Sequence, residues 1–188
     1  METLIELLKK IDGIGKKSAE KILVDLISNK ESLISIDNVI KSIETDYVEC
    51  ERCYYFKYKN RCAFCDDSSR NKNILCVVSS VLDAQRILHS DFRGVIHVLK
   101  GEINVNKNRF PKNLTLKELF VRINPEVEVL LALNLTFNGE VTSNYIANAI
   151  KNKANKVSRI ARGIPLGGML DYIDNETLND AIKNRKKV

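Results

Sequence analysis

The sequence predicts an α+β protein built from several parts in series. Apolar residues recur at helical spacing through the first 48 residues. Four of the five cysteines then fall between residues 50 and 65, in two closely spaced pairs. Beyond residue 73, short apolar runs alternate with helical segments, as in a parallel sheet covered by helices.

The first 48 residues are expected to form three helices. The stretch "TLIELLKKI" places four apolar side chains on one face: Leu4, Leu7, Leu8 and Ile11. The run "KKSAEKILVDLISN" does the same with Ala19, Ile22, Leu23 and Leu26. A third, short helix is expected over residues 31–44.

The connection between the first two helices carries glycines in the stretch "IDGIGKKSAEKIL". Gly13 and Gly15 permit a tight turn, and the free amides at the start of the next helix can bind a phosphate. Lys16, Lys17 and Lys21 follow at once and would attract a nucleic-acid backbone without regard to sequence. We interpret the stretch as a DNA-binding helix–hairpin–helix. The alternative is a plain helix–helix turn with solvated lysines.

The cysteine pairs have the spacing of a structural metal site, with ligands Cys50, Cys53, Cys62 and Cys65. Two Cys-x2-Cys turns can close a tetrahedral zinc site, which leaves no open position for catalysis. Zinc would supply folding energy to a segment with few core residues, and the aromatic run 54–58 would cover it. Disulfides are disfavoured in a reducing compartment, and a thioredoxin-type motif needs only one pair. An iron–sulfur cluster remains an alternative.

Strands are expected at residues 73–80, 94–100, 126–134 and 156–163, with helices at 81–90, 115–123 and 141–154. Cys76 lies inside the first of these strands and is expected to be a small buried side chain. The remaining tail starts with turn residues and ends in a further helix.

The predicted strand ends lack the carboxylates that metal-assisted phosphoryl chemistry needs. Ser79 and Ser80 end the first strand, and Asn134 ends the third. Asp83 and Glu140 lie nearby, but two scattered acids make a poor magnesium site. The sequence shows no nucleophile triad and no phosphate-binding glycine loop. It therefore indicates a protein that is not an enzyme.

Neither histidine has an evident partner in the sequence. His97 lies in an apolar strand, where a satisfied structural histidine is expected rather than a catalytic base. His89 follows a helix and has no neighbour that suggests a role.

Charge permits nucleic-acid binding without establishing it. The net charge is +6, but residues 1–48 carry seven lysines against nine acidic residues. No apolar run approaches the ~20 residues of a membrane-spanning helix, and the first residues do not resemble a secretory signal. The protein is expected in the cytoplasm.

Taken in order, these motifs resemble the bacterial recombination-mediator family RecR. The resemblance rests on "IDGIGKKSAEKI", the four cysteines, "ILCVV", "LNLTFNGEVTSNYI" and "SRIARGIPLGGMLDYID" followed by "TL". It covers essentially the whole chain, and residues 159–174 are its most specific part.

The resemblance implies four regions: a helix–hairpin–helix at 1–48, a four-cysteine zinc motif at 49–73, a Toprim α/β domain at 74–163 and a C-terminal oligomerisation segment at 164–188. It also implies a DNA-binding dimer or ring-like tetramer. With RecO, and in many bacteria RecF, such a protein helps to load RecA onto DNA coated by single-strand-binding protein. Lys17 and Lys21 match positions that touch DNA, and Asp83 and Glu140 match the face that meets RecO.

The sequence also departs from the family pattern. Ser79 stands where the family usually has a Toprim glutamate, and Asn138 replaces the first acid of "EGE". These losses weaken the case for magnesium and put the RecO-facing surface in doubt. Two alternatives remain open: a metal-dependent Toprim phosphotransferase, and a pure protein–protein adaptor.

Overall fold

The computed structural model describes residues 1–161 and 163–185. Arg162 and residues 186–188, which close the predicted strand 156–163 and the C-terminal segment, lie outside the described residues. The chain divides into two compact units. The first comprises Met1–Val48 and Tyr58–Asn60, and the second comprises Glu49–Lys57 together with the chain from Arg61 onward.

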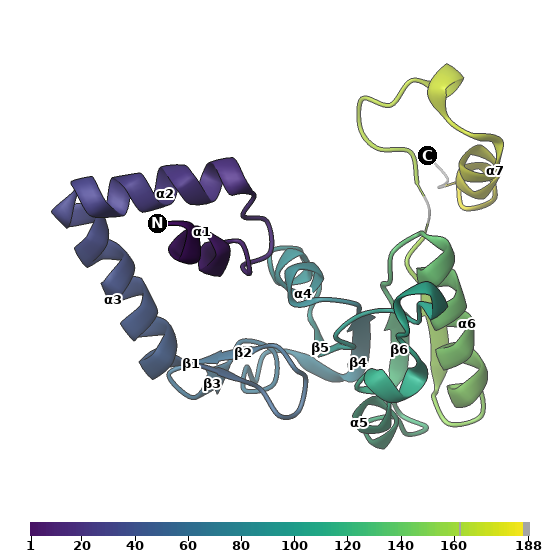
Figure 1. The fold of residues 1–188 in the computed structure, drawn as a ribbon. Coiled ribbons are helices and arrows are strands. Elements are labelled where there is room, and N and C mark those ends of the chain that lie inside the picture. The colour runs from purple at the N-terminus through teal and green to yellow at the C-terminus, as the bar shows by residue number, and fades with distance from the viewer. Residues whose placement is uncertain (162, 186–188) are drawn as a thin grey trace. The chain divides into compact units, whose positions relative to one another are not determined.

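The first unit is helical, with α1 at Glu2–Leu8, α2 at Lys16–Ser28 and α3 at Lys30–Asp46 (Figure 1). Its small core consists of Ile5, Ala19 and Leu23. Asn29 begins α3, because its side-chain oxygen accepts hydrogen bonds from the first free amides of that helix. The three predicted helices are therefore present.

Three short strands, β1 at Tyr47–Glu49, β2 at Phe56–Tyr58 and β3 at Arg61–Cys62, form a small sheet in the order β1-β2-β3. Lys59 and Asn60 connect the last two, and both have positive φ, 47° and 63°. Two such residues form the two-residue turn that matches the twist of a hairpin.

The main sheet has four strands: β4 at Asn71–Val78, β5 at Gly94–Val98, β6 at Glu128–Leu131 and β7 at Lys156–Arg159. Their order is β5-β4-β6-β7, and every neighbouring pair is parallel. The connections contain α4 at Val81–Leu88, α5 at Leu116–Val121 and α6 at Phe137–Ile150, and short 3-10 turns at Val105–Lys107 and Pro111–Asn113. The predicted parallel sheet with helices is confirmed.

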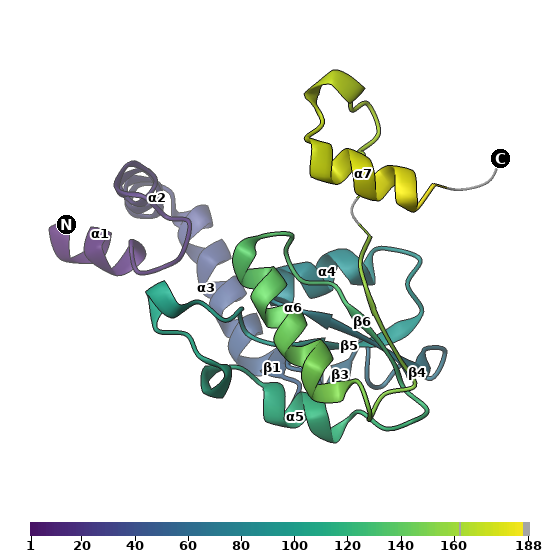
Figure 2. The same cartoon turned by 90° about the vertical axis from the view of Figure 1, so that its right-hand side faces the viewer.

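Alternate side chains of β4 enter two different cores. Leu75 and Val77 belong to a core that includes residues of α5 and α6; Figure 2 looks onto α6 with the strands behind it. Cys76 and Val78 belong to a second core, which includes Ala84 of α4 and all four clustered cysteines. The cysteine motif therefore helps to cover one face of the main sheet.

The C-terminal segment contains a 3-10 turn at Leu170–Tyr172 and the helix α7 at Asn175–Lys183. Asp174 begins α7, because its carboxylate accepts a hydrogen bond from the Thr177 amide at 2.9 Å. Among the described residues, no helix combines the length and apolar character needed to cross a bilayer.

Candidate functional site

The four cysteine sulfurs form one compact, buried group. They all lie within 4.8 Å of one another, and Cys53 and Cys62 are 3.5 Å apart. Four sulfurs around a zinc ion would stand roughly 3.8 Å apart, given a Zn–S distance of about 2.3 Å. Since the donors are all thiols, the group fits a soft metal ion such as zinc. Elsewhere in the described chain, no three His, Cys, Asp or Glu side chains are placed to hold a metal.

The local backbone brings each pair of cysteines together. The Cys50 amide donates to the Tyr55 carbonyl at 2.6 Å, and the Cys50 carbonyl accepts from the Tyr54 amide at 2.8 Å. In the second pair, the Cys65 amide points at the Cys62 sulfur, 3.4 Å away. The Asp66 carboxylate accepts from the Cys62 amide at 2.8 Å. These are the turns that two Cys-x2-Cys spacings predict.

The sulfurs also influence one another's protonation. A hydrogen bond to the Cys62 sulfur, together with burial, raises the pKa of Cys53. The same bond lowers the pKa of the Cys62 thiol. A metal ion would displace the remaining protons, because thiolates are the ligands that it binds.

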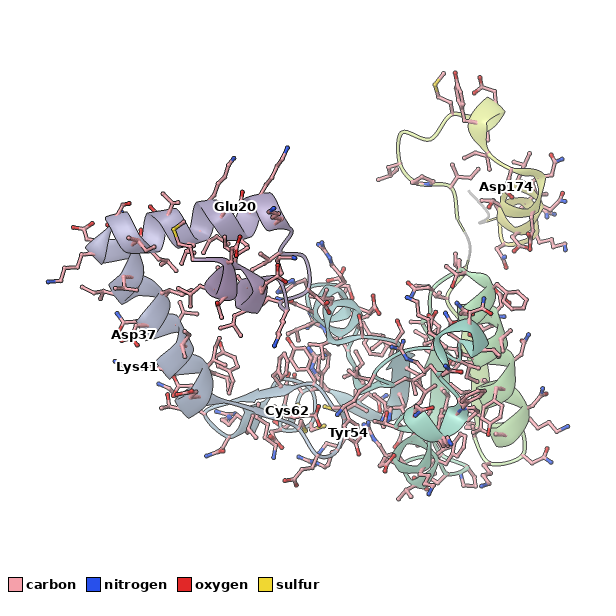
Figure 3. All side chains as sticks on the ribbon, in the orientation of Figure 1. Glu20, Asp37, Lys41, Tyr54, Cys62 and Asp174 are labelled. Atoms are coloured by element: carbon pink, nitrogen blue, oxygen red, sulfur yellow. The ribbon has the colours of Figure 1, made fainter. Side chains whose placement is uncertain are left out.

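The aromatic residues cover the motif only in part. Tyr55 meets the buried Phe64 edge to face, with 5.2 Å between ring centroids, and Tyr54 packs against the same core (Figure 3). Phe56 and Tyr58 are instead exposed, so the prediction that they cover the site was wrong. Alternation along the β2 strand turns these two side chains away from the core.

His97 is fully buried and hydrogen bonded on both ring nitrogens. Its Nε2 lies 2.9 Å from the carbonyl and hydroxyl oxygens of Thr115, and its Nδ1 lies 3.2 Å from Arg122 Nη1. Since arginine can only donate, Nδ1 accepts and Nε2 carries the hydrogen. Burial and the Arg122 charge lower the pKa of His97 to about 3. The prediction of a satisfied structural histidine is confirmed.

The glycine turn presents bare helix amides beside lysines. Gly13 has a φ of +88°, which side-chain-bearing residues rarely adopt. Gly15 begins α2 without a side-chain cap. Lys16, Lys17 and Lys21 are all exposed. Lys17 and Lys21 lie one turn apart, on the helix face opposite the buried Ala19 and Leu23. Groups of the kind that bind phosphate, free helix amides and lysines, are thus gathered at the start of α2.

Ion pairing distinguishes these lysines from others in the same unit. Lys41 is paired with Asp37 at 2.6 Å (Figure 3), and Lys9 with Glu6 at 2.7 Å. Within the described chain, no carboxylate lies within 4.0 Å of the nitrogens of Lys16, Lys17 or Lys21. Their charges are therefore available to an external anion.

A chain of hydrogen bonds joins the carboxyl ends of the strands. Asn134 Nδ2 donates to Ser79 Oγ at 3.2 Å and to Glu102 Oε1 at 2.9 Å. Ser79 Oγ donates in turn to Asp83 Oδ2 at 2.7 Å. Asp83 Oδ2 also accepts hydrogen bonds from the amide and the hydroxyl of Ser80. Neutral protein donors thus engage one oxygen of each carboxylate, Asp83 Oδ2 and Glu102 Oε1. Two carboxylates among neutral side chains are not the acidic cluster that a magnesium site needs, so the residues present do not fit one.

These side chains line a cavity of about 690 Å³, the walls of which also carry Lys100, Lys107 and Arg109. Lys100 pairs with Glu49 at 2.7 Å and lies over the Tyr54 ring. The cavity thus mixes acidic and basic side chains.

The two predicted partner-binding acids are already engaged within the chain. Asp83 lies in the first turn of α4 and completes its capping box with Ser80. Glu140 lies in the first turn of α6 and pairs with Arg159 of β7 at 2.7 Å. Among the described residues, Asp83 and Glu140 share no hydrogen-bond partner.

Three residues of these networks were not anticipated from the sequence: Glu102, Arg122 and Arg159. Each forms a hydrogen bond or an ion pair with a residue distant in the chain. Glu102, for example, accepts a hydrogen bond from Asn134. No local pattern marks such pairs. For Arg122, the only available signal was a single basic residue at the end of an apolar helix.

The parallel sheet, the neutral strand ends and the buried cysteine group define a multi-part α+β protein with a metal-binding motif. Comparison with protein families matches residues 73–161 to the Toprim domain and residues 163–186 to "RecR, C-terminal". The chain is thus a Toprim-domain protein that carries a specific C-terminal extension.

Comparison with whole proteins leads to a single family. The chain is 35% identical over 191 residues to the "Recombination protein RecR" of Thermus thermophilus, covering 100% of this chain and 98% of that one. It is 36% identical to the protein of that name from Clostridium perfringens, over 98% of this chain and 95% of the relative. The Psychrobacter cryohalolentis protein is 32% identical with the same coverage. The chain belongs to the RecR family.

Proposed function

We propose that this protein is a non-enzymatic DNA clamp and adaptor in recombinational repair. It acts with RecO, and with RecF as a further partner, to load RecA onto DNA coated by single-strand-binding protein. The observation that carries the proposal is the glycine turn with its unpaired lysines, in a chain similar over its full length to proteins named for recombination.

The contact with DNA is electrostatic and made to the backbone. Helix amides and lysines bind phosphates and carry no sequence information. The protein therefore binds single and double strands without sequence preference. Each lysine–phosphate contact releases counterions, so the affinity falls steeply as salt is raised.

Charge reversal in the turn tests this contact. The double variant Lys17→Glu, Lys21→Glu should lose electrophoretic-shift binding at 100 mM salt and keep its circular dichroism spectrum. The control Lys151→Glu, Lys153→Glu makes the same change in net charge at exposed positions after α6, and it should retain most binding. Equal loss in both variants would mean that overall charge, not the turn, holds DNA.

The absence of catalysis is proposed from the strand-end network. The carboxylates that would hold magnesium are bonded to Ser79, Ser80 and Asn134. No phosphodiester cleavage or primer synthesis is expected from the pure protein, with or without magnesium. Product that depends on magnesium would favour the alternative of a Toprim phosphotransferase.

The cysteine group is proposed to hold structural zinc, because four buried thiols fit that ion. Emission spectrometry of the purified protein should find about one zinc per chain. Iron with visible absorption would indicate an iron–sulfur cluster instead.

Association of subunits is proposed from α3. This helix has no buried residue, yet one side of it carries large apolar side chains that are about half exposed: Leu33, Ile36, Ile40 and Ile43. A contiguous apolar face of this kind marks an interaction surface. We infer that a second copy of the chain covers it, giving a dimer or a tetrameric ring.

The four regions 1–48, 49–73, 74–163 and 164–188 are proposed as its functional parts, in the cytoplasm. Asp83 and Glu140 are proposed to contribute to the RecO-facing surface. For Glu140 this requires exchange of its ion pair with Arg159. Replacing Glu140 with Gln should weaken RecO capture in a pull-down without changing DNA binding. Unaltered capture would remove Glu140 from that surface.

A further inference from the structure

Arg122 is a half-buried guanidinium that joins two parts of the second unit. It follows the last residue of α5. Its Nη1 lies 2.7 Å from the Ile96 carbonyl of β5 and 3.2 Å from the Arg52 carbonyl, between the first two cysteines. The same nitrogen lies 3.2 Å from Nδ1 of His97. Arg122 thus fastens the cysteine motif to the sheet.

All of these partners are neutral. Carbonyl groups and an imidazole accept hydrogen bonds but carry no negative charge to balance the guanidinium. Two arginines of the cysteine motif are paired with acids, Arg52 with Asp66 and Arg70 with Asp67. Within the described chain, no carboxylate oxygen lies within 4.0 Å of Arg122. A partly desolvated cation without a counter-charge is costly.

The cysteine group supplies negative charge close by. Four thiolates around a divalent ion carry a net charge of about −2. Cys65 and Arg122 line the same cavity, of about 470 Å³. Glu51 and Glu118 line it as well, but neither forms an ion pair with Arg122 within the described chain. Burial lowers the pKa of Arg122, whereas the charges of Cys65, Cys53 and Cys50 raise it. The Arg52 carbonyl that Arg122 binds lies in the turn between Cys50 and Cys53, which places the guanidinium beside the cysteine motif.

We propose that Arg122 is the counter-charge of the metal–tetrathiolate centre and, through the Arg52 and Ile96 carbonyls, positions the motif on the sheet. The inference rests on the proposed metal centre. Arg122 is a positioning residue and not a ligand. Its charge should favour the metal-loaded state, because the −2 charge is complete only when the thiols have lost their protons.

Three variants separate the charge of Arg122 from its hydrogen bonds. Arg122→Gln keeps a side-chain donor but removes the charge, and Arg122→Lys keeps the charge but loses the planar fork. Lys117→Gln is the control, since it removes an exposed cation of α5 that has no ion pair within the described chain. Zinc affinity is measured on the full chain by competition with a chromophoric chelator. The cobalt–thiolate absorption of each variant reports whether four sulfurs still bind.

Arg122→Gln should bind zinc about 10- to 100-fold more weakly than the wild type, the range found when groups around metal ligands are removed. Arg122→Lys should lose markedly less zinc affinity, and Lys117→Gln should stay within a few fold of the wild type. The four-sulfur cobalt spectrum should persist in all three. In excess chelator, the melting temperature of Arg122→Gln should be no lower than that of the wild type. Without the metal, the wild-type protein carries the Arg122 charge with no thiolate charge to balance it.

The outcomes that contradict the proposal are distinct. Equal losses in the Gln and Lys variants would show that hydrogen-bond geometry matters and not charge. A melting temperature lowered equally with and without metal would mean a purely structural role. If Arg122→Gln fails to fold, a zinc affinity of Arg122→Lys that is reduced about 10-fold or more from the wild type overturns the proposal alone, because that variant keeps the charge. If the wild type binds no zinc or cobalt, the proposed metal centre itself fails.

Discussion

His97 shows how a single buried residue links two polar networks. It accepts from Arg122 on one side and donates to Thr115 on the other. The Thr115 hydroxyl then donates to the Val98 carbonyl at 2.8 Å. A polar side chain inside an apolar strand is tolerated because each of its polar atoms has a partner.

Acid should therefore destabilise the fold through His97. Its pKa is about 3 in the folded protein and about 6.5 when unfolded, so the unfolded state binds the proton first as pH falls. The contribution is fully present above pH 6.5 and is lost progressively down to about pH 3. Urea unfolding should show a loss of about 1.4 kcal/mol between pH 7.5 and 5.5 from this group.

The variant His97→Gln can make both hydrogen bonds but does not titrate. It should lose that part of the pH dependence, with bound metal measured in parallel at each pH. A variant with the same slope as the wild type would mean that other groups cause the effect.

At the residue scale, some site residues could be predicted from the sequence and others could not. Cys50, Cys53, Cys62 and Cys65 could be found because their spacing alone defines the ligand group. Asn134 could be seen as a neutral strand end, but not as a donor to Glu102, 32 positions away. Such contacts depend on how strands are ordered, which short-range patterns do not encode.

At the scale of elements, the cysteine motif belongs to the core of the sheet domain. The Val98 amide of β5 donates to the Cys53 carbonyl at 2.8 Å. The cysteines pack with Cys76, Val78, Ile96 and Val98 in one core. The motif was expected as a metal-stapled segment of its own. Its burial against β4 and β5 could not be foreseen, because apolar alternation shows that a strand has two buried faces but not what covers each.

Removing the metal should therefore loosen the sheet as well as the motif. Hydrogen exchange with and without a strong chelator should show faster exchange in β4 and β5 once the metal is removed. The amides of α2 should be unchanged, because the core of Ile5, Ala19 and Leu23 contains no cysteine. Protection lost only in residues 50–65, with β4 and β5 unaffected, would contradict a shared core.

The parallel direction of the strands was predictable because strand and helix signals alternate strictly after residue 73, whereas their order in the sheet was not. The residues at which helices end were less predictable. Residues 3–11 indicate a helix to Ile11, yet α1 ends at Leu8 because the chain must turn ahead of Gly13. The apolar face of α3 was not recognised as exposed, since periodicity alone does not show what packs on it.

At the scale of the whole molecule, the proposed clamp requires several weak sites to act together. A few lysine–phosphate contacts per subunit would give modest affinity, and linked subunits would raise it by effective concentration. The exposed apolar face of α3 is the surface proposed to link them. Ile36→Glu with Ile40→Glu should lower the mass in solution, since two charges would have to be buried.

The most direct test of the clamp is retention on DNA of different topology. Protein is loaded on a nicked circle and on the same molecule linearised, and is then washed at a salt concentration that weakens phosphate contacts. We predict retention on the circle and loss from the linear form, with the Ile36→Glu, Ile40→Glu variant lost from both. Equal loss from circle and linear DNA by the wild-type protein would contradict encirclement.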